Sequence, residues 1–202
     1  LNMGGDLNMG IKDYLEYDGF SYKFVPIRNR QRTSEVGFAD PDKLYDMMTN
    51  VYKWDALGRP DYYADNQHLY TFCGVLSQRA LFVNVAKEMV KAGHPERAVE
   101  MLDKCLACVP EKNYPLDISY LGYSNELMVM DMINLYYVLG EKDKASDLAT
   151  RFLDKMFQSV NFFFQFYDYA KDDFERARSI VLMVQDIAKD SGDEDVVGLV
   201  EA

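Results

Sequence analysis

Residues 80–110 read ALFVNVAKEMVKAGHPERAVEMLDKCLACVP, with apolar side chains at helical spacing on both sides of a short Gly-His-Pro segment. Gly93 suits the end of a helix, because glycine adopts left-handed backbone cheaply. Pro95 suits the first turn of the next helix, where no N–H is needed, and Pro110 ends that helix. The stretch therefore predicts two helices joined by a tight turn.

The spacing within this hairpin resembles a tetratricopeptide (TPR) repeat. The TPR pattern has a turn glycine, then a small residue, a large apolar residue, a second small residue and a closing proline. These positions hold Gly93, Ala98, Leu102, Cys105 and Pro110. In the first helix, Phe82, Val85 and Ala86 stand at the aromatic and Leu-Gly positions of the family, whereas Met89 replaces its usual tyrosine.

A second copy of the pattern follows. Gly140 opens another turn, and the residues at the next TPR positions are Ala145, Ala149 and Phe152. The two glycines are 47 residues apart, whereas a standard TPR repeat has about 34 residues. The resemblance therefore implies an irregular, TPR-like α-α superhelix of antiparallel helix hairpins. Its repeats are expected near residues 79–110 and 126–157, with a degenerate third at 174–200.

The predicted fold class is mainly α with a small N-terminal β-strand or hairpin. Residues 1–39 are expected to hold a flexible N-terminus and the strand, and residues 40–202 the TPR-like helical domain. Phe20, Tyr22 and Phe24 alternate with polar residues, which predicts a strand with one apolar face. A lone strand is unstable, so residues 35–38 are considered as its hairpin partner.

One segment is unusually aromatic: residues 160–169 read VNFFFQFYDY. It could be buried in the last helical layer or form an exposed binding patch. We expect it to be buried, because aromatic residues at helical spacing usually pack in a core.

Composition limits the classes of partner. The chain has 202 residues, is 49% hydrophobic and carries a net charge of -11, so it can form a core but repels nucleic acid and anionic lipid. Its apolar runs are shorter than the roughly 20 residues that span a bilayer, so no direct membrane insertion is expected. Because the chain begins with Leu1 and not with Met, it is expected to be a fragment or a processed form.

The sequence offers no specific catalytic or metal-binding motif. Cys105 and Cys108 have C-x-x-C spacing, but they lie near a helix C-terminus, where the dipole does not activate a thiol. No second Cys pair or His pair completes a zinc site, and no hydrolase, zinc-protease, Walker or Rossmann motif occurs. We therefore expect buried structural thiols, no metal, no cofactor and no enzymatic activity in this chain.

A wider resemblance covers most of the chain. The matching features are Tyr14-Leu15, Gly19, Tyr22, Val25-Pro26, Asp42, Met47-Met48 and Lys53-Trp54. Together they are similar to the extracytoplasmic C-terminal region of a bacterial multi-pass membrane protein family of unknown function, related to protein O-mannosyltransferases of the glycosyltransferase-C type. The resemblance implies a periplasmic location beside the inner membrane and an upstream transferase portion, which could supply sheet partners for the predicted strand.

The TPR register also predicts a binding groove, because the first helix of each pair lines the concave face. The groove candidates are Val83, Lys87, Val90 and Lys91 from the first repeat and Met130, Asn134, Tyr137 and Val138 from the second. Lys87 and Asn134 could together hold a carboxylate or a backbone carbonyl of an extended peptide, whereas solvated lysines are the alternative.

Three functions follow as hypotheses. The first is a non-catalytic interaction module that binds a polypeptide or its own upstream domain in the groove. The second is a purely structural domain that packs on a missing α/β portion of the parent protein, with an exposed apolar patch around Phe20, Tyr22 and Phe24. The third and least favoured is a carbohydrate-active enzyme domain, which would need a pocket with paired carboxylates.

Overall fold

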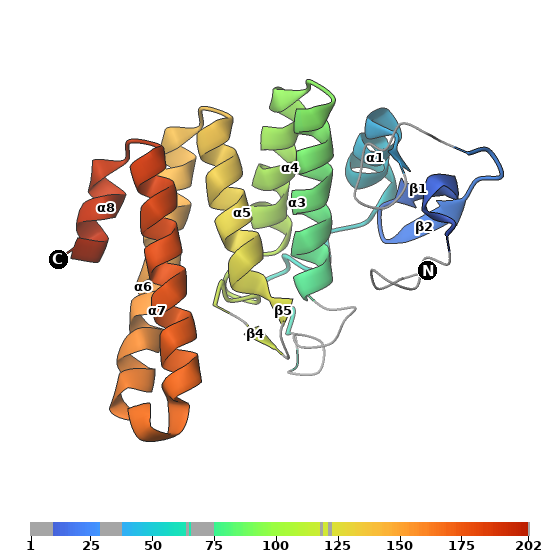
Figure 1. Cartoon of the computed structure of the whole chain (residues 1–202). Helices are drawn as coiled ribbons and strands as arrows, with labels where there is room; N and C mark the ends of the chain where they lie inside the picture. The colour runs from blue at the N-terminus through green and yellow to red at the C-terminus, as the bar shows by residue number, and fades with distance from the viewer. Residues whose placement is uncertain are drawn as a thin grey trace. The chain divides into compact units, whose positions relative to one another are not determined.

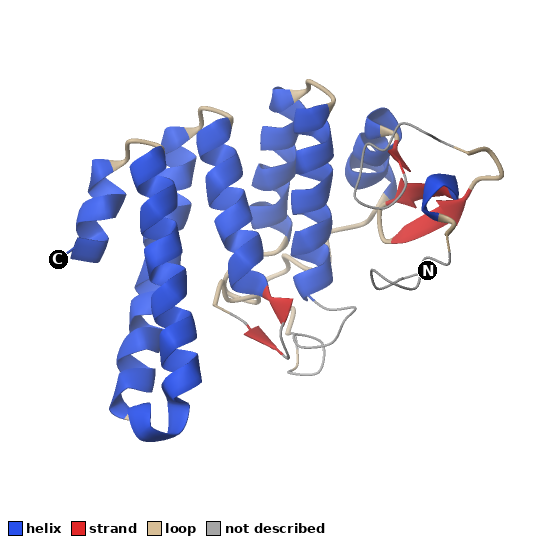
Figure 2. Cartoon of the chain, viewed as in Figure 1, coloured by secondary structure: helices blue, strands red, loops and turns tan. Residues whose placement is uncertain are grey.

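The computed structural model describes residues 10–28, 38–63, 65, 75–117, 119–120 and 123–201. These residues are mainly α-helical, with a small sheet near the N-terminus, as predicted (Figures 1 and 2). The expected flexible segment at residues 1–9 lies outside the described residues, as do residues 29–37. The chain divides into two compact units, one of residues 1–64 and 77–113 and one of residues 65–76 and 114–202.

The first unit contains a three-stranded sheet. After a short 3-10 helix, η1 (Lys12–Tyr14), come β1 (Leu15–Asp18), β2 (Ser21–Phe24) and β3 (Phe38–Ala39), in the order β2-β1-β3. The partner of the predicted strand is β1, which pairs with β2 antiparallel, whereas β3 pairs with β1 in parallel. The expected hairpin between β2 and residues 35–38 is therefore wrong for Phe38, which pairs with Glu16.

The β1–β2 hairpin is produced by a two-residue turn, Gly19 and Phe20. Gly19 has a φ of 71°, the left-handed region that such turns require at their first residue. The Asp18-Gly19 dipeptide between two alternating segments is a hairpin signal that could have identified β1 from the sequence.

A short helical segment follows the sheet in the first unit. It consists of α1 (Pro41–Asp46) and the π-helical turn η2 (Met47–Val51). Asp40 caps α1 by accepting a hydrogen bond of 3.1 Å from the Lys43 N–H. Beyond η2, the buried Trp54 donates its indole N–H to the Met48 carbonyl at 2.9 Å, and its ring centroid lies 4.6 Å from that of Phe82.

The remaining helices are joined in antiparallel pairs (Figure 1). They are α3 (Val75–Lys91), α4 (Pro95–Cys108), α5 (Asn125–Val138), α6 (Lys142–Gln165), α7 (Tyr167–Asp190) and α8 (Glu194–Glu201), with the short β4 (Ser119–Tyr120) and β5 (Tyr123–Ser124) ahead of α5. The predicted hairpins are therefore present as α3–α4 and α5–α6, and the third predicted helix pair as α7–α8.

The turns at Gly93, Gly140 and Gly192 have the same geometry. Their φ values are 81°, 81° and 66°. In each turn the glycine N–H donates to the carbonyl three residues earlier, and the next residue donates to the carbonyl five residues earlier, at 2.9–3.1 Å. This is the Schellman arrangement, which satisfies the last carbonyls of a helix. The predicted turns at Gly93 and Gly140 are confirmed, and the third turn matches them.

Residues at fixed distances from the three turn glycines are also buried to a similar extent. The residue four positions before each glycine is fully buried: Met89, Tyr136 and Ala188. The residue five positions after it is also buried: Ala98, Ala145 and Val197. Equivalent positions are therefore buried in all three helix pairs.

The second unit has one feature that this repeat pattern does not contain. α6 and α7 have 24 residues each, whereas α5 has 14. The last buried residue of α6 is Met156 and the first of α7 is Ala177, and the two helices extend past the end of α5 (Figure 1). We name residues 157–176 the arm. The expectation that residues 160–169 are buried is wrong, because they form the tip of the arm.

Candidate functional site

The eight predicted groove residues separate into two groups by their distance from the turn glycine. Ten residues before the glycine, Val83 has no exposed surface and Met130 is buried. Three residues before it, Val90 and Tyr137 are half-buried. The positions six and two residues before the glycine are more open: Lys91, Asn134 and Val138 are exposed and Lys87 is half-buried. The surface available to a ligand therefore follows the latter positions.

Within the second unit, exposed positions of this kind form a row on each of two neighbouring helices. We name it the first-helix face, and it consists of Leu127, Asp131, Asn134 and Val138 on α5 and Ser179, Met183, Asp186 and Asp190 on α7. All eight lie thirteen, nine, six or two residues before a turn glycine, and Asp131 alone is half-buried. The helices α5 and α7 contact each other (Figure 1). The two rows have the same positions relative to their turn glycines, so they correspond to equivalent faces of adjacent helices.

Sequence reasoning identified only Asn134 and Val138 of this face. The other six residues follow from the same register, extended by two helical turns on α5 and carried over to α7 by the third glycine. The signal was therefore present in the sequence, but the predicted groove also included Val83 and Met130, which are buried, and Val90 and Tyr137, which are half-buried.

The chemistry of the first-helix face is mixed. Leu127, Val138 and Met183 are large apolar residues with a third or more of their surface exposed, and Val138 is 66% exposed. The same face contains the Asn134 amide, which can both donate and accept hydrogen bonds. It also contains the carboxylates of Asp186 and Asp190, which can accept them. This combination suits a polypeptide, whose backbone and side chains offer both kinds of contact.

Tyr137 is not free to contact a ligand through its hydroxyl. The hydroxyl donates to Asp193 Oδ2 at 2.8 Å, and Ser146 Oγ donates to the same oxygen. Asp193 is buried, and its Oδ1 accepts a hydrogen bond of 3.3 Å from the Val196 N–H at the start of α8. Tyr137 therefore holds the α7–α8 corner in place.

The environment of Asp193 favours its ionised form. Burial acts to raise the pKa of this carboxyl, but hydrogen bonds from Ser146, Tyr137 and the Val196 N–H outweigh burial, so its pKa is lowered. Burial and the hydrogen bond to Asp193 raise the pKa of Tyr137. The cluster thus consists of an ionised cap and a neutral phenol, which is a structural arrangement.

In the first unit, the lysines of the predicted groove are less open than expected. Lys91 Nζ lies 2.7 Å from Glu88 Oε1, so its charge is already paired on α3. Lys87 belongs to the first unit and Asn134 to the second. The joint clamp of these two residues on one peptide group stays a prediction.

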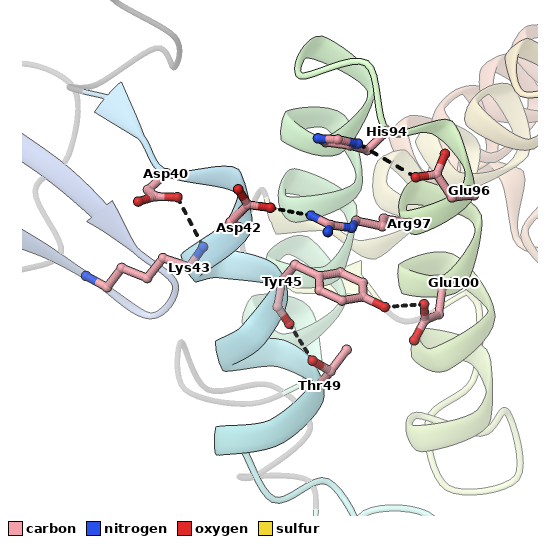
Figure 3. A network of polar contacts seen from close by, with 9 residues as sticks. All are labelled: Asp40, Asp42, Lys43, Tyr45, Thr49, His94, Glu96, Arg97 and Glu100. Atoms are coloured by element: carbon pink, nitrogen blue, oxygen red, sulfur yellow. Dashed lines mark hydrogen bonds and ion pairs between the residues drawn. The ribbon is translucent and has the colours of Figure 1, made fainter.

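A separate network of titratable side chains links α1 to α4 (Figure 3). Arg97 pairs with Asp42 at 2.5 Å, and its guanidinium lies 4.6 Å from the centroid of the Tyr45 ring. The Tyr45 hydroxyl donates to Glu100 Oε2 at 2.5 Å. The hydrogen bond and charge of Arg97 lower the pKa of Asp42. Each of these groups is used to join the two helices.

The described cysteines are poor nucleophiles. Cys105 is buried, and this burial raises the pKa of its thiol to about 12. Burial also raises the pKa of the half-buried Cys108. Because thiolate is the reactive form, a raised pKa lowers the reactivity of both thiols at neutral pH. The prediction of buried thiols is confirmed for Cys105 and is wrong for Cys108, which is half-buried. Cys73 lies outside the described residues.

Within the described part of the chain, no group of three or more His, Cys, Asp or Glu residues is placed to hold a metal ion. Among the helices of the same part, none has the length and apolar character needed to cross a membrane. No protein-family model, no curated protein and no solved structure matches this chain. The resemblances to TPR repeats and to the membrane protein family therefore remain predictions from the sequence.

Proposed function

We propose that the chain is a non-catalytic protein-interaction module that binds an extended polypeptide along the first helices of its hairpins. The observation that carries this proposal is the first-helix face, where the same four positions of α5 and α7 are open to solvent and together hold apolar, amide and carboxylate side chains. Open positions that repeat from one first helix to the next suit a ligand that is itself an extended chain.

The dimensions of the face agree with such a ligand. The row on α5 begins at Leu127 and ends at Val138, which corresponds to about 16 Å along a helix. An extended peptide advances about 3.3 Å per residue, so α5 alone accommodates roughly five residues. Leu127 and Val138 then contact apolar side chains near the two ends of that segment, and Asn134 hydrogen-bonds its backbone between them.

The proposal is tested with the full chain on an array of short synthetic peptides of varied composition. Asn134→Ala combined with Val138→Ser should reduce the array signal about tenfold, because it removes one hydrogen-bonding group and one apolar contact from the face. Val51→Ser is the matched control: Val51 is also more than half exposed but lies in η2 of the first unit. Equal peptide binding by the double variant and the wild type would reject the proposal.

A second candidate function is a purely structural role, and one observation favours it. Phe20, in the turn before the edge strand β2, and Phe24, the last residue of β2, are 54% and 55% exposed, while Tyr22 is half-buried. The expected apolar patch is thus present at two of its three residues. The patch would pack against another portion of a longer protein, and Phe20→Ser with Phe24→Ser should then weaken the docking of that portion when both are expressed together.

We also propose, from the sequence resemblance alone, that the chain belongs to the periplasmic C-terminal region of a glycosyltransferase-C-related membrane protein. Met48 and Trp54, two of the matching residues, are buried and joined by a hydrogen bond, which supports a structural role for that motif. Recovery of the full open reading frame tests the proposal, and an upstream sequence without hydrophobic spans would reject it.

A further inference from the structure

The tip of the arm exposes more aromatic surface than any other described part of the chain. Its five most exposed aromatic residues are Phe162, Phe164, Phe166, Tyr167 and Tyr169, with Phe164 65% and Tyr169 94% exposed. They lie around the turn at Phe166, which follows α6, and around the kink at Ala170 near the start of α7. Exposed aromatic clusters of this kind mark interaction sites, because burying them in a partner is strongly favourable.

The tip is ordered before any partner arrives. The ring centroids of Phe162 and Phe166 are 5.2 Å apart, and the Phe174 ring lies 5.8 Å from Phe164 and 5.4 Å from Tyr167. The Tyr169 and Ala170 N–H groups both donate to the Phe166 carbonyl at 2.9 Å, which holds the turn. Side chains that already pack on one another lose little entropy on binding, so the tip is suited to act as a docking surface.

Charge selects the partner. Asp168, Asp172 and Asp173 are exposed among the aromatic residues. The nearest basic residue in the sequence is Lys171, so acidic residues outnumber basic ones in this segment. Asp168 and Asp172 form no ion pair with any other described residue, so their charges are available to a ligand. Arginine and lysine side chains are attracted both to carboxylates and to the faces of aromatic rings.

We infer that the arm tip is a docking site for a basic, amphipathic polypeptide segment, in which arginine or lysine alternates with apolar side chains. The apolar side chains contact the Phe164 and Phe166 rings, and the cations lie over Tyr169 and beside Asp168 and Asp172. A tip-to-tip contact between two copies of the chain would bring these aspartates together, and an anionic lipid surface would repel them. Asp168 and Asp172 therefore favour a basic polypeptide over a second copy of the chain or an anionic lipid surface.

The test measures binding of the full chain to two fluorescent peptides by anisotropy. The peptides share their apolar residues, but one carries arginine and the other glutamate between them. The arginine peptide should bind, with an affinity that falls as salt rises, and the glutamate peptide should not. Phe164→Ser with Tyr169→Ser should weaken binding about tenfold, and Asp168→Asn with Asp172→Asn should flatten the salt dependence.

Two controls separate this site from the others. Tyr63→Ser removes a ring that is 83% exposed in the first unit, and Val51→Ser removes a side chain that is 54% exposed in η2; both should leave binding of the arginine peptide unchanged. A loss caused by Val138→Ser and not by the tip variants would move the binding to the first-helix face and overturn the inference. If the double tip variant loses its helical circular dichroism, binding of the arginine peptide is measured with Tyr169→Ser alone. The Tyr169 ring is almost fully exposed, so its removal should leave the fold intact and still weaken binding.

Two further outcomes would overturn the inference. One is concentration-dependent dimerisation in sedimentation velocity that the tip variants abolish, with no binding of the arginine peptide, which would make a second copy of the chain the partner. The other is tip-dependent binding to phosphatidylcholine vesicles without peptide binding, which would make a lipid surface the partner. Equal binding of the two peptides would likewise contradict selection by charge.

Discussion

Asp193 is the buried carboxylate on which the α7–α8 corner depends. It accepts hydrogen bonds from Tyr137, Ser146 and the Val196 N–H. Asp193→Ala removes a helix cap, which contributes about 1 kcal/mol, and leaves a phenol and a serine hydroxyl without their charged acceptor. The expected loss in the free energy of unfolding is about 2–4 kcal/mol. Asp193→Asn keeps the shape and an acceptor oxygen, so its expected loss is about 1–2 kcal/mol.

The effect depends on pH in a direction that follows from the lowered pKa of Asp193. An unfolded aspartate has a pKa of about 3.9. Because the folded pKa is lower than that, the unfolded state binds the proton more readily, and the carboxylate stabilises the fold fully above the unfolded value. Its contribution is lost as the pH falls through the folded pKa.

The assay is urea unfolding followed by circular dichroism, at neutral pH and at about pH 3, on the wild type, Asp193→Asn, Tyr137→Phe and the double variant that combines both changes. The free energy of unfolding should be higher for the wild type than for Asp193→Asn at neutral pH, and this difference should become smaller in acid. The double variant should lose less than the sum of the single losses, because the two residues share a hydrogen bond. A difference that stays constant with pH would refute the assignment of the stabilisation to the ionised carboxylate.

Two further predictions concern the turns and the thiols. Gly93→Ala should cost about 1 kcal/mol of unfolding free energy, because the left-handed backbone there disfavours a Cβ although no atom lies within 4 Å of it. Gly198→Ala, in the middle of α8 with equally open surroundings, should instead raise the urea midpoint, and a shift of both variants in one direction would contradict the argument. The thiols are tested at neutral pH with a colorimetric thiol reagent on the Cys73→Ser variant, which retains Cys105 and Cys108. The reagent should modify Cys108 slowly and should not modify Cys105 until urea unfolds the chain. Rapid modification of Cys105 in the folded protein would show that it is not buried.

The helix pairs could be predicted because their signals are local. A glycine with left-handed backbone and a proline at the first turn depend only on neighbouring residues, and helical periodicity identifies the face that must be buried. Met89 and Tyr136 each lie four residues before a turn glycine, and both are fully buried. The Asp18-Gly19 turn between β1 and β2 is an equally local signal, because a two-residue hairpin turn depends on a glycine with left-handed backbone.

The candidate surfaces were predicted less well, since exposure depends on neighbours that periodicity does not reveal. Val83 and Met130 fit the groove register of the TPR family, yet both are buried. Asn134 and Val138 fit the same register and are exposed. A register specifies directions around one helix, but it does not specify how closely the next helix approaches.

Local chemistry was sufficient for the turns at Gly93 and Gly140, the helix faces around them and the mainly α class, because backbone preference and side-chain period act within a few residues. The exposure of the arm and the role of Asp193 depended on packing between distant segments. The aromatic tip remains uncovered because α5 is shorter than α6 and α7, and Asp193 is ionised because Tyr137 is brought to it from another helix. Both depend on relative lengths and positions of helices, which no local pattern encodes.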